Sequence, residues 1–286
     1  MSELRKLVAE ELGAPVDPRV SGIAAAIAAR HGEASRAILF YGSCLREKQL
    51  DGLMLDFYLI VSDYRSAYRK RWLAAANRLI PPNVFYFEKD GLAAKYAVLS
   101  EADFHRLNGP ETRNVSVWAR FAQPSRLVWA AGNEARERAV TAIARAAPTL
   151  LAAAKPKPDE DELTLWRRAF ALTYSSELRA ERKGRATSVV DIDPDRYLRF
   201  TKPALAAAQG LKPRGTWAFR RVEGRALSVL RLSKASLTFA GGAEYIAWKI
   251  NRHAQTNIEL KPWQKRHPLL AGLSRLPRLL LSGAVR

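Results

Sequence analysis

The stretch "FYGSCLREKQLDGLMLDFYLIV", residues 40–61, carries a carboxylate inside an apolar run. Residues 53–61 have the length and the aliphatic and aromatic composition of a buried strand. An ionised Asp56 inside such a strand is costly unless a cation or hydrogen-bond donors meet it. The stretch therefore predicts a strand and requires a partner for its acidic residue.

A Gly-Ser pair precedes this strand. Residues 37–41 form a short apolar run of strand length, and Gly42 and Ser43 follow it directly. Because glycine has no side chain, the backbone N–H groups of such a turn can approach the oxygens of a triphosphate. A carboxylate on the neighbouring strand can hold Mg²⁺ against the same phosphates, which makes Asp56 a candidate metal ligand. The alternative is a structural carboxylate and an ordinary strand-ending turn.

The composition is that of a folded protein without disulfides. The chain has 286 residues, of which 48% are hydrophobic, and this favours about two domains with real cores. The single cysteine excludes an internal disulfide framework, and the four scattered histidines lack metal-ligand spacing. No run of eighteen apolar residues occurs, and the start "MSELRKLVAEEL" is typical of neither a signal nor a transit peptide. We expect a soluble or peripheral protein.

Positive charge is concentrated in the second half of the chain. Residues 1–150 contain 21 Lys and Arg against 16 Asp and Glu, whereas residues 151–286 contain 26 against 12. Such asymmetry indicates a polyanionic partner for the second half, either nucleic acid or an anionic membrane. The alternative is a basic surface that serves solubility alone.

The order of the predicted elements indicates an α/β first domain with a mixed sheet. Helices are predicted over residues 18–31 and 65–80, and strands over 37–41, 53–61, 83–88 and 94–100. The segment "KPKPDEDE", residues 155–162, is the predicted linker, and the pattern beyond it is mainly helical. We predict a first domain over 1–154, a helical domain over 163–250 and a basic tail over 251–286.

Five segments follow one another along the chain in an informative order. They are "FYGSCL" with "LMLDFYLIVSD", then "AKYAVLS", "WARFAQPSRLVW", "EDELTLWRRAFALTYSSELRAE" and "LSVLRLSKASLTFAGGAEYIAWKI". Together they resemble a bacterial-type member of the mitochondrial-type CDP-diacylglycerol synthases, a phosphatidate cytidylyltransferase family with the nucleotidyltransferase fold of DNA polymerase β. The likeness covers residues 36 to 250, roughly.

This resemblance implies an activity and a set of catalytic residues. The enzyme would use Mg²⁺ to join CTP and phosphatidic acid into CDP-diacylglycerol, with release of pyrophosphate. Asp56, Lys95 and Arg179 are the expected catalytic residues, with Lys95 also contacting CTP beside Gly42 and Ser43. The family architecture implies a winged-helix-like second domain with the site between the two domains.

Further roles follow from the same resemblance. Asp63, where the family also has an acidic residue, or Glu177 from the second domain would complete the metal site of Asp56. Arg231 and Lys234 would contact the lipid phosphate or the membrane.

The chain also departs from the family pattern. Residues 176–179 read Ser-Glu-Leu-Arg where Gly-Asp-x-Arg is expected, and residues 68–69 read Tyr-Arg in place of an aromatic-His pair. Met54 and Tyr58 flank Asp56, so the strand lacks the second carboxylate that is common in the superfamily. The first two differences concern the choice of substrate more than the chemistry, whereas the third requires a second acidic ligand from elsewhere in the chain.

Two rival functions remain open at this stage. A nucleotidyltransferase that acts on RNA would use the basic second half and its tryptophans. A module without catalysis that binds an anionic membrane or nucleic acid is the other. The favoured partners are CTP, phosphatidic acid and an anionic membrane surface, with no stable nucleic-acid partner, at the cytoplasmic face of a bacterial cell membrane.

The tail after residue 260 has the pattern of an interfacial helix. Leucines recur at helical spacing from Leu269, and Pro277 with two arginines makes the segment unsuited to span a bilayer. Trp263, Lys265 and Arg266 precede the leucines and would contact the membrane surface. The alternative is that this leucine stripe packs on the protein's own second domain.

Overall fold

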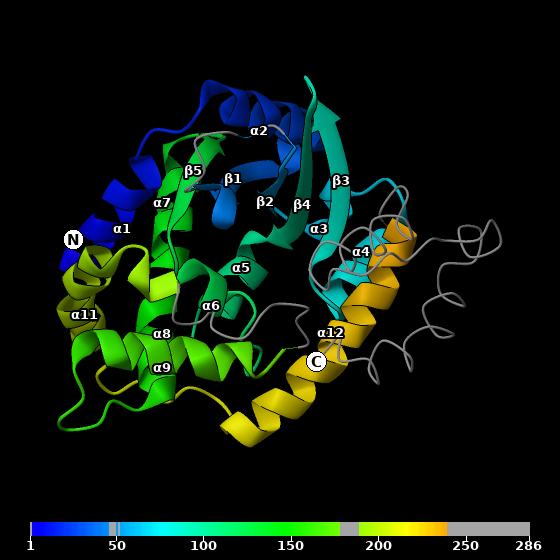
Figure 1. Ribbon diagram of the computed structural model, residues 1–286. Coiled ribbons are helices and arrows are strands. Elements are labelled where there is room, and N and C mark those ends of the chain that lie inside the picture. The colour runs from blue at the N-terminus through cyan, green and yellow to red at the C-terminus, as the bar shows by residue number, and fades with distance from the viewer. Residues whose placement is uncertain (1, 46–49, 51, 178–188, 239–286) are drawn as a thin grey trace.

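An open five-stranded mixed sheet organises the chain (Figure 1). The computed structural model describes residues 2–45, 50, 52–177 and 189–238. The strand order is β3-β4-β2-β1-β5, in which only β2 and β4 pair in parallel. The strands are β1 Ser35–Tyr41, β2 Met54–Val61, β3 Asn83–Lys89, β4 Leu92–Ser100 and β5 Ser125–Ala130. The predicted α/β class is confirmed.

Helices cover both faces of the sheet, because alternate residues of the central strands are apolar on each side. The core on the side of Phe57 includes the helices α2 Pro18–His31, α3 Tyr64–Ala67 and α4 Arg71–Leu79. The core on the side of Tyr58 includes α1 Glu3–Gly13, α5 Glu101–Leu107, α6 Trp118–Phe121, α7 Asn133–Ile143, α8 Ala146–Ala154, α9 Glu162–Tyr174 and α11 Pro194–Ala208. The short helices η1 Gly32–Ala34 and η2 Ser43–Leu45 flank β1, and α12 Trp217–Thr238 packs along β3 (Figure 1).

The basic helix predicted over residues 65–80 is in fact two helices. Asp63 caps α3, and Tyr68 leaves the helix with extended backbone angles before α4 begins at Arg71. The Tyr68 side chain is buried and packs against His31 and Phe85. Burial of this aromatic ring against α2 and β3 explains why the helix breaks here.

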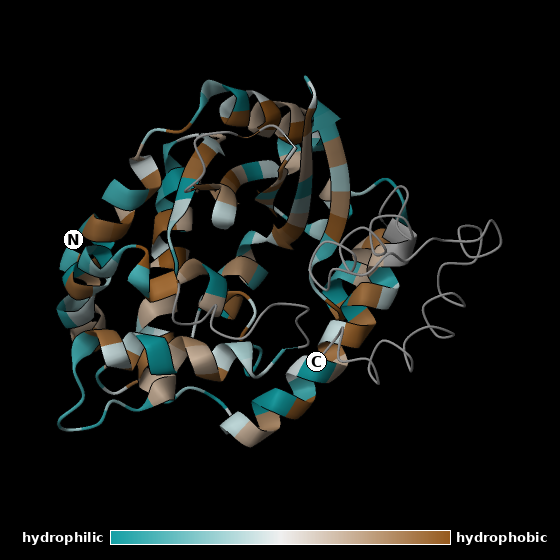
Figure 2. Ribbon diagram, viewed as in Figure 1, coloured by the Kyte–Doolittle hydropathy of each residue, from teal (hydrophilic) through white to brown (hydrophobic). Residues whose placement is uncertain are grey.

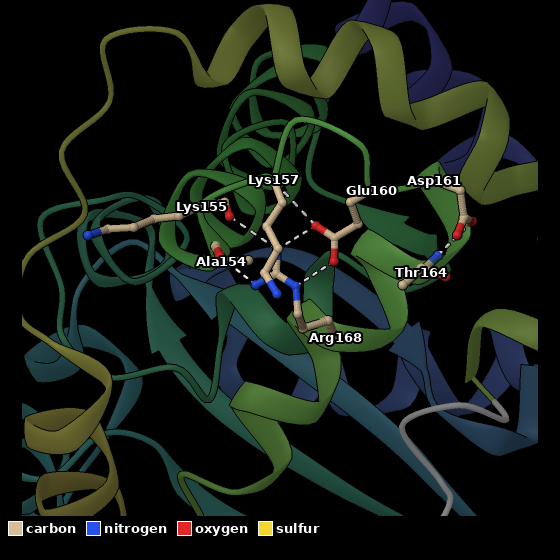
Figure 3. A network of polar contacts seen from close by, with 7 residues as sticks. All are labelled: Ala154, Lys155, Lys157, Glu160, Asp161, Thr164 and Arg168. Carbon is tan, nitrogen blue, oxygen red and sulfur yellow. Dashed lines mark hydrogen bonds and ion pairs between the residues drawn. The ribbon is translucent and has the colours of Figure 1, made fainter.

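The predicted linker is a tightly bound turn between α8 and α9 (Figure 3). Arg168 of α9 pairs with Glu160 through contacts of 2.5 and 2.6 Å and donates to the carbonyl of Ala154 at 2.7 Å. The Glu160 side chain is only 6% exposed, and its hydrogen bond from Arg168 lowers its pKa. Residues 155–162 therefore fix α9 against α8 instead of separating two bodies.

One hydrophobic core crosses the predicted domain boundary. Trp166 of α9 and Tyr197 of α11 belong to the same buried cluster as Tyr58 of β2 and Leu150 of α8. Helices α9 and α11 thus complete the packing of the sheet face that carries Tyr58. No helix in the described part of the chain has the length and hydropathy of a membrane span.

A buried ion pair joins the start of the chain to α11 and generates a prediction. Arg196 donates to both carboxylate oxygens of Glu11 and to the carbonyl of Ala122. The two side chains are 7% and 12% exposed, so Glu11→Ala would leave a buried guanidinium without its counter-charge. We expect this variant to lose about 3–5 kcal/mol of unfolding free energy in urea denaturation.

Glu10 provides the matched control for this variant. Glu10 pairs with Arg199 at 3.6 Å, and both side chains are well exposed. Glu10→Ala should therefore cost less than about 1 kcal/mol. Equal losses in the two variants would contradict the importance of the buried pair.

Candidate active site

One row of paired residues crosses the sheet at the level of Asp56. Tyr41 of β1 pairs with Asp56 of β2, Asp56 pairs with Lys95 of β4, and Lys95 pairs with Tyr86 of β3. Residues that pair across strands project from the same face of a sheet. These four side chains therefore share the face that carries Tyr58.

Asp56 and Lys95 form an ion pair at the centre of this row. Lys95 Nζ lies 2.9 Å from Asp56 Oδ1, and the side chains are 24% and 19% exposed. The parallel pairing of β2 with β4 places the cation beside the carboxylate, which is what an acidic residue in a strand requires. Both groups keep contact with solvent, so each can also meet a ligand.

The Gly42 turn adjoins this pair. Gly42 follows Tyr41 with a φ of +94°, a conformation that favours glycine, and a Cβ at this position would stand 3.2 Å from Asp56 Oδ2. Glycine thus keeps the space beside the carboxylate open. Ser43 starts the short helix η2 that continues the turn. The structure therefore brings Gly42, Asp56 and Lys95 together, as the sequence predicts.

Arg120 of α6 forms a second cationic group beside the row. Its Nη1 donates to Tyr58 Oη at 3.1 Å and to the carbonyl of Ser116 at 2.8 Å. The guanidinium carbon lies 5.3 Å from the centroid of the Tyr41 ring and 5.8 Å from that of Tyr58. These contacts hold the cation over the two tyrosines that flank the Asp56 level.

The electrostatic surroundings of Arg120 connect two carboxylates. Burial acts to lower the pKa of Arg120, but Tyr58, Tyr41, Glu177 and Asp56 act in the opposite direction, and the pKa lies above its ordinary value. Two of these four groups, Glu177 and Asp56, are acids. Arg120 therefore lies within the field of both acids and stabilises them together.

Helix α12 carries two more basic side chains, Arg231 close to Arg120 and Lys234 close to Arg231. Arg231 Nε donates to the carbonyl of Pro81 at 2.8 Å, and its Nη1 donates to Ser116 Oγ at 3.1 Å. Among the described residues, Arg231 Nη2 is buried without a hydrogen-bond partner. Lys234 Nζ donates to the carbonyls of residues 80 and 82. The predicted lipid contacts of Arg231 and Lys234 are not on an outer surface: both side chains point inward and tie α12 to the turn before β3.

Glu177 reaches the same region because α12 carries a glycine. A Cβ at Gly224 would lie 2.0 Å from the carbonyl oxygen of Ser176, so only glycine permits this approach of α12 to the segment after α9. Burial lowers the pKa of Arg231, and the neighbouring Glu177 acts to raise it. Glu177 is thus close to Arg231 and to Arg120, and Asp56 is also a neighbour of Arg120.

Asp63 is not part of this group. It lies beyond the far end of β2, at least roughly 16 Å along the strand from Asp56. Its carboxylate is engaged as the cap of α3, where it accepts from the backbone of Arg65 and Ser66 at 2.8 and 3.0 Å. Asp63 therefore cannot share one metal ion with Asp56, and the prediction that it completes the metal site is wrong.

Some predicted residues lie outside the described part of the chain. They are Arg179, Trp263, Lys265 and Arg266. Within the described residues, no group of three or more His, Cys, Asp and Glu side chains lies together.

Tyr41, Ser116 and Arg120 were missed at the sequence level. Arg120 stands in "WARFAQPSRLVW", where an arginine between apolar residues was the available signal. Two adjoining hollows of about 240 and 290 Å³ share Leu45 and Arg126. The first is lined by Phe40, which alternates with Tyr41, so it opens on the side of the sheet away from Asp56.

Comparison with known proteins adds no relative to this picture. No protein-family model matches the chain, and no curated protein matches it. The resemblance to CDP-diacylglycerol synthases therefore depends on the quoted motifs.

The close contact at Gly224 generates a prediction for stability. Gly224→Ala introduces a methyl group that overlaps the backbone of Ser176, so either α12 or the segment before Glu177 must move. We expect a loss of about 2–3 kcal/mol in chemical denaturation. In the control Gly22→Ala, the added methyl group of α2 meets nothing within 4 Å, and a gain of about 0.4–1 kcal/mol is expected. A similar gain in both variants would contradict the contact.

Lys234 generates a prediction for pH dependence. Burial, assisted by the charge of Arg231, lowers the pKa of Lys234 to about 7 from 10.5. Between these values the unfolded chain binds a proton that the folded chain does not, so stability rises with pH in this window. Relative to Lys234→Met, the wild-type protein should gain about 2 kcal/mol of unfolding free energy between about pH 7 and pH 9.

The exposed Lys212 supplies the control for the pH experiment. Lys212→Met should show the same pH profile as the wild-type protein in urea titrations. If the unfolding free energy of Lys234→Met changes with pH in the same way as that of the wild-type protein over this window, the lowered pKa of Lys234 is refuted.

Proposed function

We propose that this chain is an Mg²⁺-dependent nucleotidyltransferase that converts CTP and phosphatidic acid into CDP-diacylglycerol and pyrophosphate. The observation that carries the proposal is the opening at Gly42, which lies directly beside the Asp56 carboxylate and its partner Lys95. A glycine turn, a carboxylate and a lysine that lie together are the groups needed to bind a triphosphate and its metal ion. Arg120 and Arg231 extend the positive charge of this place.

The donor set fits a magnesium ion. Mg²⁺ in nucleotide enzymes is usually held by one or two carboxylates together with substrate phosphates and water. Asp56 would hold it, and Glu177 is the other acid near Arg120. When bound, the ion supplies neutralisation of the charge on the reacting phosphates.

The chain's own residues then perform positioning. Lys95 and the Gly42–Ser43 turn hold the triphosphate, and Arg231 Nη2, which lacks a described partner, donates to the phosphate of the acceptor. A phosphate oxygen of the acceptor forms a bond to the α-phosphorus of CTP, and the bond from that phosphorus to pyrophosphate breaks. The attacking oxygen is already anionic, so no residue has to remove a proton. Catalysis is then orientation and charge stabilisation.

The lipid substrate implies a location at a membrane surface. The excess of cations in residues 151–286 suits an anionic bilayer, and the tail with Trp263, Lys265 and Arg266 is a candidate anchor. We assign the protein to the cytoplasmic face of a bacterial cell membrane as part of this proposal.

Asp56→Asn tests the proposed catalytic role. The amide keeps the size of the side chain but removes the charge that a hard cation requires. We expect at least about a hundredfold loss in the formation of CDP-diacylglycerol from labelled CTP, Mg²⁺ and phosphatidate vesicles, with an unchanged circular dichroism spectrum. Asp63→Asn keeps the helix cap and should retain wild-type turnover. Near-normal turnover of Asp56→Asn would contradict the assignment of Asp56 as a metal ligand.

The choice of acceptor is tested with the same labelled nucleotide. The proposal requires label transfer to phosphatidic acid and none to RNA oligonucleotides. Transfer to RNA would support the rival nucleotidyltransferase, and transfer to neither acceptor would favour a module without catalysis.

A further inference from the structure

Exposed apolar side chains gather on two helices. Among the described residues, eight large hydrophobic side chains are exposed, and six of them belong to α4 and α12. These six are Trp72, Leu79, Phe219, Val222, Leu230 and Leu232. Exposed apolar side chains that cluster on neighbouring elements indicate an interaction surface, whereas singly scattered ones do not.

Helix α12 is apolar on the face that it turns away from the protein. Val222 and Leu230 are 73% and 47% exposed and follow one stripe at helical spacing through Ala226. Phe219 begins this stripe and is 49% exposed, with the guanidinium carbon of Arg113 4.5 Å from its ring centroid. The opposite stripe of the same helix carries the inward Arg231, together with the buried Arg220 and Gly224. Figure 2 shows brown segments along α12, between teal and pale ones.

Helix α4 continues the surface. Trp72 and Leu79 are 47% and 78% exposed and lie seven residues apart, on one side of α4. Arg231 and Lys234 bind the carbonyls of residues 80–82, so the end of α4 lies near the C-terminal third of α12. Figure 1 shows the two helices as neighbours beside β3.

The charges around these apolar groups are positive. Exposed cations flank them at Arg69, Lys70, Arg71, Arg78 and Arg225. Neither α4 nor the stretch from Arg69 to Arg71 contains an acid, and the single acid of α12, Glu223, turns toward Arg113 at 3.2 Å. The surface formed by α4 and the outer face of α12, called here the α4–α12 surface, is therefore apolar with a cationic rim.

We propose that the α4–α12 surface lies on an anionic lipid bilayer. Tryptophan, leucine and aliphatic side chains enter the interfacial region, and the arginines and lysine contact lipid phosphates. A second copy is a poorer occupant, because a two-fold contact would bring the same cations together. The proposal rests on the lipid substrate of the proposed function and adds the face by which the enzyme meets it. Since α12 also carries Arg231 on its inner stripe, docking would place lipid headgroups close to the candidate active site.

Vesicle binding of the full chain tests the surface. Leu230→Asp and Val222→Asp should each reduce co-sedimentation with phosphatidylcholine vesicles that contain phosphatidic acid by about tenfold. The matched control is Leu198→Asp, which changes a leucine of α11 that is 44% exposed. Figure 1 shows α11 well away from α12. This control should bind as the wild-type protein does, and equal losses for Leu198 and Leu230 variants would overturn the proposal.

A second measurement locates the contact even where another segment also tethers the chain. The only cysteine, Cys44, is 5% exposed, so an environment-sensitive dye attached to Leu230→Cys reports on α12. The dye should shift to the blue when the vesicles are added, whereas the same dye on Leu198→Cys should not shift. An unshifted dye at residue 230 on protein that pellets with vesicles would overturn the proposal.

The outcomes separate this surface from the proposed chemistry. Vesicle binding requires no CTP, so normal binding without CDP-diacylglycerol formation would contradict the chemistry and support the surface. A change from dimer to monomer in Val222→Asp, measured by sedimentation velocity, would assign the stripe to a contact between copies and overturn the lipid proposal.

Discussion

The carboxylate of Asp56 is tolerated in strand β2 because Lys95 stands beside it on β4, and this pairing depends on the register of the sheet. A shift of one residue would oppose Asp56 with Ala94 or Tyr96 and turn the acid toward the other core. The antiparallel pairing with β1 fixes Tyr41 on the other side of Asp56, and Gly42 follows immediately. The strand register that pairs Asp56 with Lys95 therefore also places the Gly42 turn beside the Asp56 carboxylate. Stability and the candidate site share one geometric condition.

Helix α12 closes the arrangement from the edge strand β3. Its inner stripe approaches the segment after α9 at Gly224 and binds the turn before β3 through Arg231 and Lys234. Glu177 and Arg231 thereby arrive from two segments that are distant in sequence from Asp56. The tight turn around Glu160 and Arg168 keeps α9 in position for this contact (Figure 3). The two regions that the sequence pattern separates therefore pack together around the sheet through one hydrophobic core.

The local patterns of the sequence were sufficient for the central strands, for α2 and for the meeting of Gly42, Asp56 and Lys95. Strand β5 was not predicted, because Arg126 and Trp129 obscure its alternation and Pro124 precedes it. The break at Tyr68 and the tied turn at Glu160 depend on partners far along the chain, which periodicity does not contain. Lys234 illustrates the same limit: the resemblance implied contact with the lipid phosphate or the membrane, but two backbone carbonyls hold the side chain inside. Sequence patterns predict which elements form, whereas long-range contacts decide which side chains they turn inward.

The charges at the site are unbalanced, and this imbalance has a physical consequence. Three cations, Lys95, Arg120 and Arg231, lie near the two carboxylates of Asp56 and Glu177, and Lys234 lies close to Arg231. The lowered pKa of Lys234 and that of Arg231 are signs that burial and like charge oppose further positive charge there. A buried excess of cations is costly unless an anion offsets it. A polyphosphate bound beside Gly42, as proposed, would supply such an anion. Binding of an anionic substrate would therefore reduce the electrostatic cost of this excess positive charge. In this way the packing of α12 is connected to the chemistry proposed at Asp56.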